Sequence, residues 1–79
     1  MNTYETIRGI LIDRIKIPAD VITEKATLNQ IELDSLSAVE LSMELEQIYG
    51  ETFRDEEILA SENIAGLVTL VEQRTGAGR

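Results

Sequence analysis

Apolar residues recur at helical spacing near the N-terminus. The first such stripe consists of Tyr4, Ile7, Ile10, Leu11 and Ile15. Intervals of three and four residues place these side chains on one face of an amphipathic helix. We therefore expect a helix over about residues 3–16, capped at its N-terminus by Asn2 or Thr3.

The helical period is lost after this stripe. Pro18 disfavours helical geometry at Ile17, and no sustained period returns before Asp34. Loops this long are uncommon in compact domains, so we expect the connection over residues 17–34 to be anchored by its own apolar residues and to contain a short helical turn. Those residues are Val21, Ile22, Leu28, Ile31 and Leu33.

A second long helix is predicted over residues 35–49. Asp34 can accept hydrogen bonds from the first backbone N–H groups, and Gly50 suits the left-handed position that follows a helix. Between them the chain consists largely of helix formers.

Two more helices complete the prediction. A short one over about 55–59 has acids in its first turn, and Ser61 or Asn63 can cap another over about 63–74. The stripe of this last helix is Ile64, Leu67, Val68 and Val71. Residues 76–79 have nothing to bury, and we expect them to fray.

These elements predict an all-α fold. No segment alternates with the period of two that a strand requires. We expect one domain over residues 1–79, a small antiparallel bundle of three main helices and one short helix, with the long loop between the first two helices.

The helix over 35–49 has two apolar faces when its residues are placed at about 100° intervals. One face is broad enough to form core: Ala38, Leu41, Leu45, Ile48 and Tyr49. The opposite face, on which Gln47 also lies, carries Leu36, Val39, Glu40, Met43 and Glu46. We call these five residues the docking strip. An exposed apolar strip with carboxylates at its edges suits basic partner proteins. The alternative is a thin bundle that buries both faces.

Composition narrows the core and the chemistry. The 79 residues include 23 Ile, Leu and Val but only two Tyr, one Phe and no Trp, so the core should be aliphatic. The chain has no Cys and no His, which excludes disulfides, structural zinc and Cys or His nucleophiles. No apolar run approaches a membrane span and no signal peptide is evident, so we expect a cytoplasmic protein.

The net charge of −8 excludes nucleic acid and anionic membranes as partners, because both would be repelled. Most of the charge is local: residues 32–62 hold ten acids and one base. The partners should therefore be basic proteins.

Ser35 opens the acidic helix beside the docking strip. It cannot act as a catalytic nucleophile, since no base is available to activate it. It can serve as a second N-cap candidate, or it can carry a phosphate ester at a helix N-terminus, where anions are favoured. Asp34 and Glu32 oppose that anion without excluding it.

The segment LNQIELDSLSAVEL, residues 28–41, resembles the attachment-site segment of acyl carrier proteins. The resemblance extends to the acidic helix, the long preceding loop and the chain length. It implies that Ser35 carries 4′-phosphopantetheine, added from coenzyme A by a phosphopantetheinyl transferase, and that Asp34 assists metal-dependent transfer. The family's partner-recognition positions fall on Asp34 and on the docking strip: Leu36, Val39, Glu40, Met43 and Glu46.

The resemblance also implies a function. The chain would be a carrier and not an enzyme, holding acyl groups as thioesters and delivering them to synthases, acyltransferases or ligases with basic surfaces. The pathway would be fatty-acid-like, polyketide or another specialised biosynthesis. We expect a free-standing monomer without a metal site, and we expect its aliphatic core to be able to part and admit an acyl chain.

Two residues depart from the family pattern. Glu32 stands where Gly is frequent, so the backbone turn there can differ, and Arg54 replaces a frequent Pro. Both departures favour a specialised carrier. A peptidyl or aminoacyl carrier would more typically show Gly-Gly-x-Ser, which ends at the attachment serine, in place of residues 33–35.

Two other interpretations stay open from the residues alone. An acidic interaction module without a prosthetic group explains the charge, and it predicts that Ser35→Ala has no effect on function. The other interpretation is a calcium site at Asp55, Glu56 and Glu57, although this cluster lacks the alternating oxygen ligands and central Gly of an EF-hand loop.

Overall fold

The computed structural model describes residues 2–76, and its regular structure is entirely helical. The elements are α1 (Thr3–Asp13), the short 3₁₀ helix η1 (Ala19–Val21), α2 (Ser35–Tyr49), α3 (Asp55–Ala60) and α4 (Ile64–Thr75). No strand occurs among the described residues, where Thr27 and Asn63 form only an isolated antiparallel bridge. The predicted all-α bundle is confirmed.

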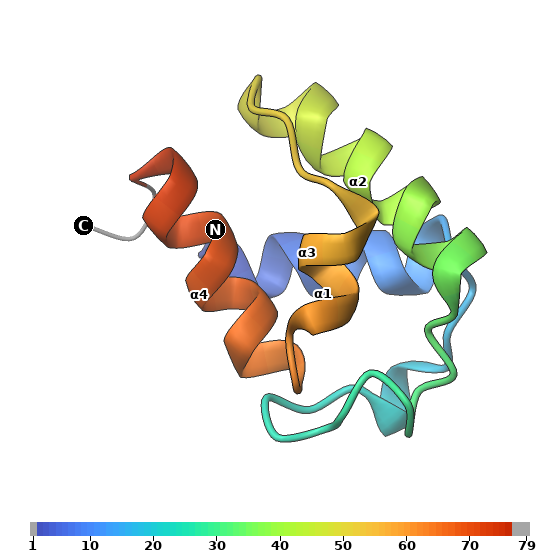
Figure 1. Cartoon of the computed structure of the whole chain (residues 1–79). Coiled ribbons are helices and arrows are strands. Elements are labelled where there is room, and N and C mark those ends of the chain that lie inside the picture. The colour runs from blue at the N-terminus through green and yellow to red at the C-terminus, as the bar shows by residue number, and fades with distance from the viewer. Residues whose placement is uncertain (1, 77–79) are drawn as a thin grey trace.

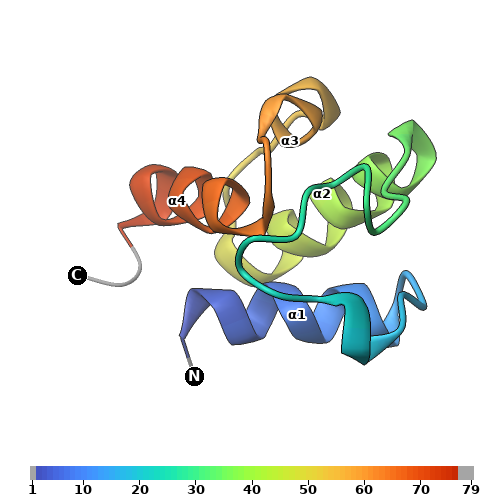
Figure 2. The same cartoon turned by 90° about the horizontal axis from the view of Figure 1, so that it is seen from below.

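The helices surround a single core. In Figures 1 and 2, α1 lies on one side of α2 and α4, and the short α3 lies on the other side. The Cα trace measures 27 × 22 × 22 Å. None of the helices within residues 2–76 is long and apolar enough to cross a lipid bilayer.

The core is aliphatic, as the composition predicted. Phe53 is the one aromatic residue among the buried hydrophobic side chains of the described chain. The largest fully buried side chains are Ile7, Leu11, Leu41, Leu45, Ile58, Ile64, Leu67 and Val71. They come from all four α-helices, so each helix contributes an apolar face to the same core.

Helix α1 begins at Thr3, with the side chain of Asn2 as its cap, but it ends at Asp13 rather than at residue 16. The reason lies beyond the helix itself. Lys16 adopts a left-handed φ of 69°, and the N–H of Ile17 donates to the carbonyl of Leu11 at 2.9 Å. This turn brings Ile17 into the core, with 8% of its surface exposed. The chain leaves the helix early because burying Ile17 requires a change of direction.

Apolar side chains anchor the long loop over residues 17–34, with one exception. Val21 is 42% exposed, so the prediction was wrong for this residue, which lies in η1. The anchors are Ile22, Leu28, Ile31 and Leu33, each no more than 5% exposed. The short helical turn expected within the loop is η1.

Backbone hydrogen bonds also join this loop to α4. The N–H of Ile64 donates to the carbonyl of Ala26 at 3.0 Å, and the N–H of Ala65 donates to the carbonyl of Glu24 at 2.8 Å. Amides in the first turn of a helix have no partner within the helix. The loop supplies those partners, and α4 thereby fixes the course of the loop.

The last two helices differ from prediction by one residue at their ends. Helix α3 extends one residue further, and α4 is shifted by one because Asn63 is its cap, accepting from the N–H of Gly66 at 2.8 Å. Gly76 closes α4 in a left-handed conformation, with a φ of 76°. The rest of the predicted frayed tail, residues 77–79, lies outside the described residues.

Candidate functional site

The N-terminus of α2 is organised by Asp34. Its backbone is extended, and one carboxylate oxygen, Oδ1, accepts a hydrogen bond from the N–H of Ser37 at 2.9 Å. Hydrogen bonding from Ser37 lowers the pKa of Asp34, because it stabilises the charged form. Asp34 is therefore the N-cap, and the alternative in which Ser35 caps the helix is wrong.

This arrangement leaves the hydroxyl of Ser35 unused. Ser35 is the first residue of α2 and is exposed, and its hydroxyl forms no hydrogen bond with any residue within 2–76. The first turn of a 15-residue helix carries a partial positive charge from its unpaired N–H groups. An anion attached to Ser35 would lie at that end of the helix.

The segment before Ser35 is held in place by its own bonds. The N–H of Thr27 donates to Oε1 of Gln30 at 2.9 Å, and the N–H of Gln30 donates to Oγ1 of Thr27 at 3.0 Å. The N–H of Leu33 donates to the carbonyl of Leu28 at 2.9 Å, and both side chains are buried. The exposed serine is thus presented by a well-supported turn.

Glu32 adopts a left-handed conformation within this turn, with a φ of 60°. Glycine is the residue that adopts this region without steric cost. The acyl carrier pattern often has Gly at this position, and Glu32 adopts a conformation that Gly would reach without that cost.

The apolar residues of the docking strip are exposed. Leu36 is 76% exposed, Val39 is 42% exposed and Met43 is 58% exposed. Glu40 and Glu46 lie exposed among them. The alternative in which a thin bundle buries both faces of α2 is therefore wrong.

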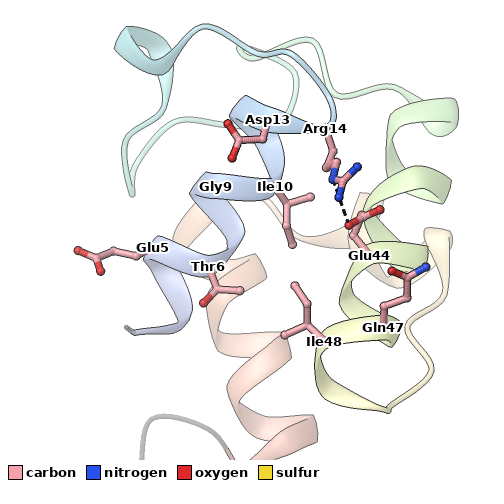
Figure 3. A pocket seen from close by; sticks show the side chains of 9 residues that line it. All are labelled: Glu5, Thr6, Gly9, Ile10, Asp13, Arg14, Glu44, Gln47 and Ile48. Carbon is pink, nitrogen blue, oxygen red and sulfur yellow. Dashed lines mark ion pairs between the residues drawn. The ribbon is translucent and has the colours of Figure 1, made fainter.

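The opposite face of α2 matches the prediction at three positions and fails at one. Ala38, Leu41 and Leu45 are fully buried, and Tyr49 is half-buried. Ile48 was predicted to be core but is 51% exposed. Its side chain lies over a groove between α1 and α2 instead of beneath a covering helix (Figure 3).

The acidic first turn of α3 does not form a metal site. Glu56 lies 3.4 Å from Arg54, and Glu57 is paired with Arg74. Within residues 2–76, no group of three or more acidic, His or Cys side chains could hold a metal ion. The structure therefore does not support the calcium site considered at Asp55, Glu56 and Glu57.

An ion pair that the sequence did not indicate joins α3 to α4. The guanidinium of Arg74 donates from Nη1 and Nη2 to the two carboxylate oxygens of Glu57, and Nη1 also donates to the carbonyl of Thr52 at 2.9 Å. The same guanidinium lies 5.5 Å from the ring centroid of Phe53. The pKa of Glu57 is lowered to about 2, mainly by the hydrogen bonds from the Arg74 side chain and secondly by the one from the backbone N–H of Arg54. We call the group formed by Thr52, Phe53, Arg54, Glu57 and Arg74 the α3–α4 clamp.

Comparison with known proteins bears on the N-terminus of α2. A family model described as a phosphopantetheine attachment site matches residues 5–71. The acyl carrier protein of Coprothermobacter proteolyticus is 30% identical over 70 residues, which cover 87% of this chain and 85% of that protein. The matched residues include all of α2. The hydroxyl of Ser35 is exposed and forms no hydrogen bond within the described chain, so it is free for attachment of such a group.

Proposed function

The chain belongs to the acyl carrier protein family, and from that premise we propose that Ser35 bears its 4′-phosphopantetheine prosthetic group. Members of this family are carriers and not enzymes, and they act with a phosphopantetheinyl transferase and acyl-processing enzymes. When bound, the group supplies a terminal thiol that holds an acyl group as a thioester. The observation that supports Ser35 most directly is its exposed, unbonded hydroxyl at the start of α2.

Asp34 serves Ser35 in two ways in this proposal. As the N-cap it holds the first turn of α2 through Ser37, so the serine is presented at a fixed position. As an exposed carboxylate next to the acceptor hydroxyl, it can also assist a metal ion during transfer of the phosphopantetheinyl group. Asn can replace Asp as a cap but not as a charged group, so the two contributions are separable.

Partner enzymes are proposed to dock on the strip formed by Leu36, Val39, Glu40, Met43 and Glu46. Its exposed apolar side chains offer area to bury, and its carboxylates attract Lys and Arg on the partner. Modest contact area and electrostatic attraction suit complexes that form quickly and dissociate quickly. This is what a carrier visiting several enzymes requires.

We propose that the cargo is an acyl group of a specialised biosynthetic pathway, fatty-acid-like or polyketide, and that the chain acts as a monomer. Residues 33–35 lack the Gly-Gly-x-Ser pattern typical of peptidyl carriers, which favours acyl over aminoacyl cargo. The intact mass of the protein isolated from its native cells tests this assignment. Acyl masses would support it, and aminoacyl masses would overturn it.

The attachment site can be tested by incubating the purified chain with coenzyme A and a broad-specificity phosphopantetheinyl transferase. We expect the intact mass to rise by one phosphopantetheinyl unit in the wild type and in Ser37→Ala, and to stay unchanged in Ser35→Ala. Asp34→Asn should retain the helix cap but slow the modification at least tenfold. A mass gain in Ser35→Ala, or none in the wild type, would contradict the proposal.

A further inference from the structure

A groove of about 550 Å³ runs between α1 and α2 (Figure 3). Its position differs from that of the docking strip: on α2, Ile48 is displaced by about 140° around the helix axis from Met43. The residues that define the groove for this argument are Gly9, Ile10, Arg14, Glu44, Gln47 and Ile48. The groove is thus a different surface from the docking strip, and Gln47 lies between the two.

The floor of the groove is apolar. Figure 3 shows Ile10 on α1 and Ile48 on α2 directed toward each other across it. Ile10 is 6% exposed, whereas Ile48 is 51% exposed although it faces away from the docking strip. A partner side chain placed between them would remove apolar surface from water, which is favourable.

Gly9 keeps one wall of the groove open. It lies in the interior of α1, where Gly destabilises a helix relative to Ala. A Cβ at this position would meet no atom within 4 Å, and its φ is not positive. Neither backbone conformation nor packing within the described chain requires Gly here, and the lack of a Cβ leaves the backbone of α1 accessible from the groove.

The charges around the groove favour a basic occupant. Arg14 lies 3.7 Å from Glu44 and closes one end, whereas Glu5 and Asp13 form no ion pair with any residue of the described chain. A second copy of a chain with a net charge of −8 would be repelled.

We propose that this groove is a second docking surface, which accepts a basic amphipathic helix of a partner protein. One apolar side chain of that helix seats between Ile10 and Ile48, and its Lys or Arg side chains approach Glu5 and Asp13. Because the docking strip stays free, this partner can remain bound while other enzymes exchange there. The proposal is independent of the prosthetic group at Ser35.

The test uses ¹⁵N-labelled protein titrated with a synthetic amphipathic helical peptide of Leu and Lys. We expect the amide resonances of Gly9, Ile10 and Ile48 to shift, and to do so equally in Ser35→Ala. A Leu36→Glu/Met43→Glu double variant, which disrupts the docking strip, should retain these shifts. A peptide with Glu in place of each Lys should not bind.

Two variants probe the groove directly. Ile48→Asp should weaken peptide binding at least tenfold, and because Ile48 is half exposed the fold should persist. Gly9→Gln should also weaken binding while raising the urea midpoint of unfolding, a combination that general destabilisation cannot produce. If Ile48→Asp proves unfolded, Gly9→Gln alone decides the question.

Several results would overturn the proposal. One is that the peptide shifts only the amide resonances of Leu36, Val39 and Met43, and that no shift occurs in the Leu36→Glu/Met43→Glu variant. Another is unchanged affinity in Gly9→Gln. Shifts at Gly9 and Ile48 that grow with protein concentration in the absence of peptide would identify a second copy as the occupant. If the peptide causes no shift there but acyl loading does, the occupant is the acyl chain.

Discussion

Glu32 adopts a backbone conformation that is unfavourable for any residue except Gly. Its φ of 60° places it in the left-handed region, where the Cβ of any residue except Gly lies too close to the following carbonyl. Its side chain is exposed, and the turn is maintained by neighbouring bonds, including the one from its own N–H to the carbonyl of Asn29 at 3.1 Å. The cost of this conformation is therefore offset by the rest of the turn.

Glu32→Gly should stabilise the protein by up to about 1 kcal/mol, because Gly adopts this φ without the steric cost. Urea unfolding should show a higher midpoint with an unchanged slope. The matched control is Glu40→Gly, the same replacement in the interior of α2, which should destabilise by about 1 kcal/mol. If both variants lose a comparable free energy of unfolding, the left-handed φ of Glu32 carries no steric cost that Gly relieves.

Helix α3 illustrates an element that depends on its neighbours. It has six residues, of which only Ile58 is buried, and a helix this short is not stable alone. The α3–α4 clamp holds its first turn, since Glu57 accepts from Arg74 and from the N–H of Arg54 at 3.1 Å. The position of α3 is therefore coupled to the ionisation of one carboxylate.

This coupling predicts a pH dependence. The pKa of Glu57 is lowered from 4.5 to about 2 in the folded protein, so its contribution is fully present above pH 4.5 and is lost as the pH falls toward 2. The free energy of unfolding, measured in urea across this range, should fall less steeply in Glu57→Gln than in the wild type. Glu56→Gln, which removes a contact between exposed side chains, is the control. Parallel curves for wild type and Glu57→Gln would refute the coupling.

At the scale of the whole molecule, the charge is segregated. Residues 32–62 contain ten acidic residues and one basic residue, whereas the rest of the chain is nearly balanced. The segment comprises α2 and α3 with the residues that flank them, where the exposed carboxylates remain hydrated. Such a field favours the approach of basic proteins to α2 and is screened by salt.

Reversing two charges on the docking strip should therefore slow association. In Glu40→Lys/Glu46→Lys we expect the association rate with a phosphopantetheinyl transferase to fall about tenfold at low salt, and by much less at high salt. Stopped-flow fluorescence measures both. Glu24→Lys/Asp20→Lys, an equal charge change in the long loop, should have a smaller effect. Equal effects of the two double variants would indicate net charge and not the docking strip.

Local features of the sequence were sufficient for most of the fold and for the position of Ser35 at the start of α2. Asp34 and Gly50 mark the ends of α2 through bonds and conformations that involve only nearby residues, as Asn63 does for α4. The period of the apolar residues identified both faces of α2, and the position of Ser35 at its start followed from the cap. Such features are encoded within a few residues, because the hydrogen bonds and side-chain spacing of a helix are local.

Other features depended on how the helices are placed relative to one another. The sequence by itself did not show that α1 ends early so that Ile17 can be buried, that Ile48 lies over a groove, or that Arg74 pairs with Glu57 seventeen residues away. Each depends on contacts between segments distant in sequence. Helical periodicity shows which side of a helix is apolar, but only tertiary packing decides how far along its length that side is covered.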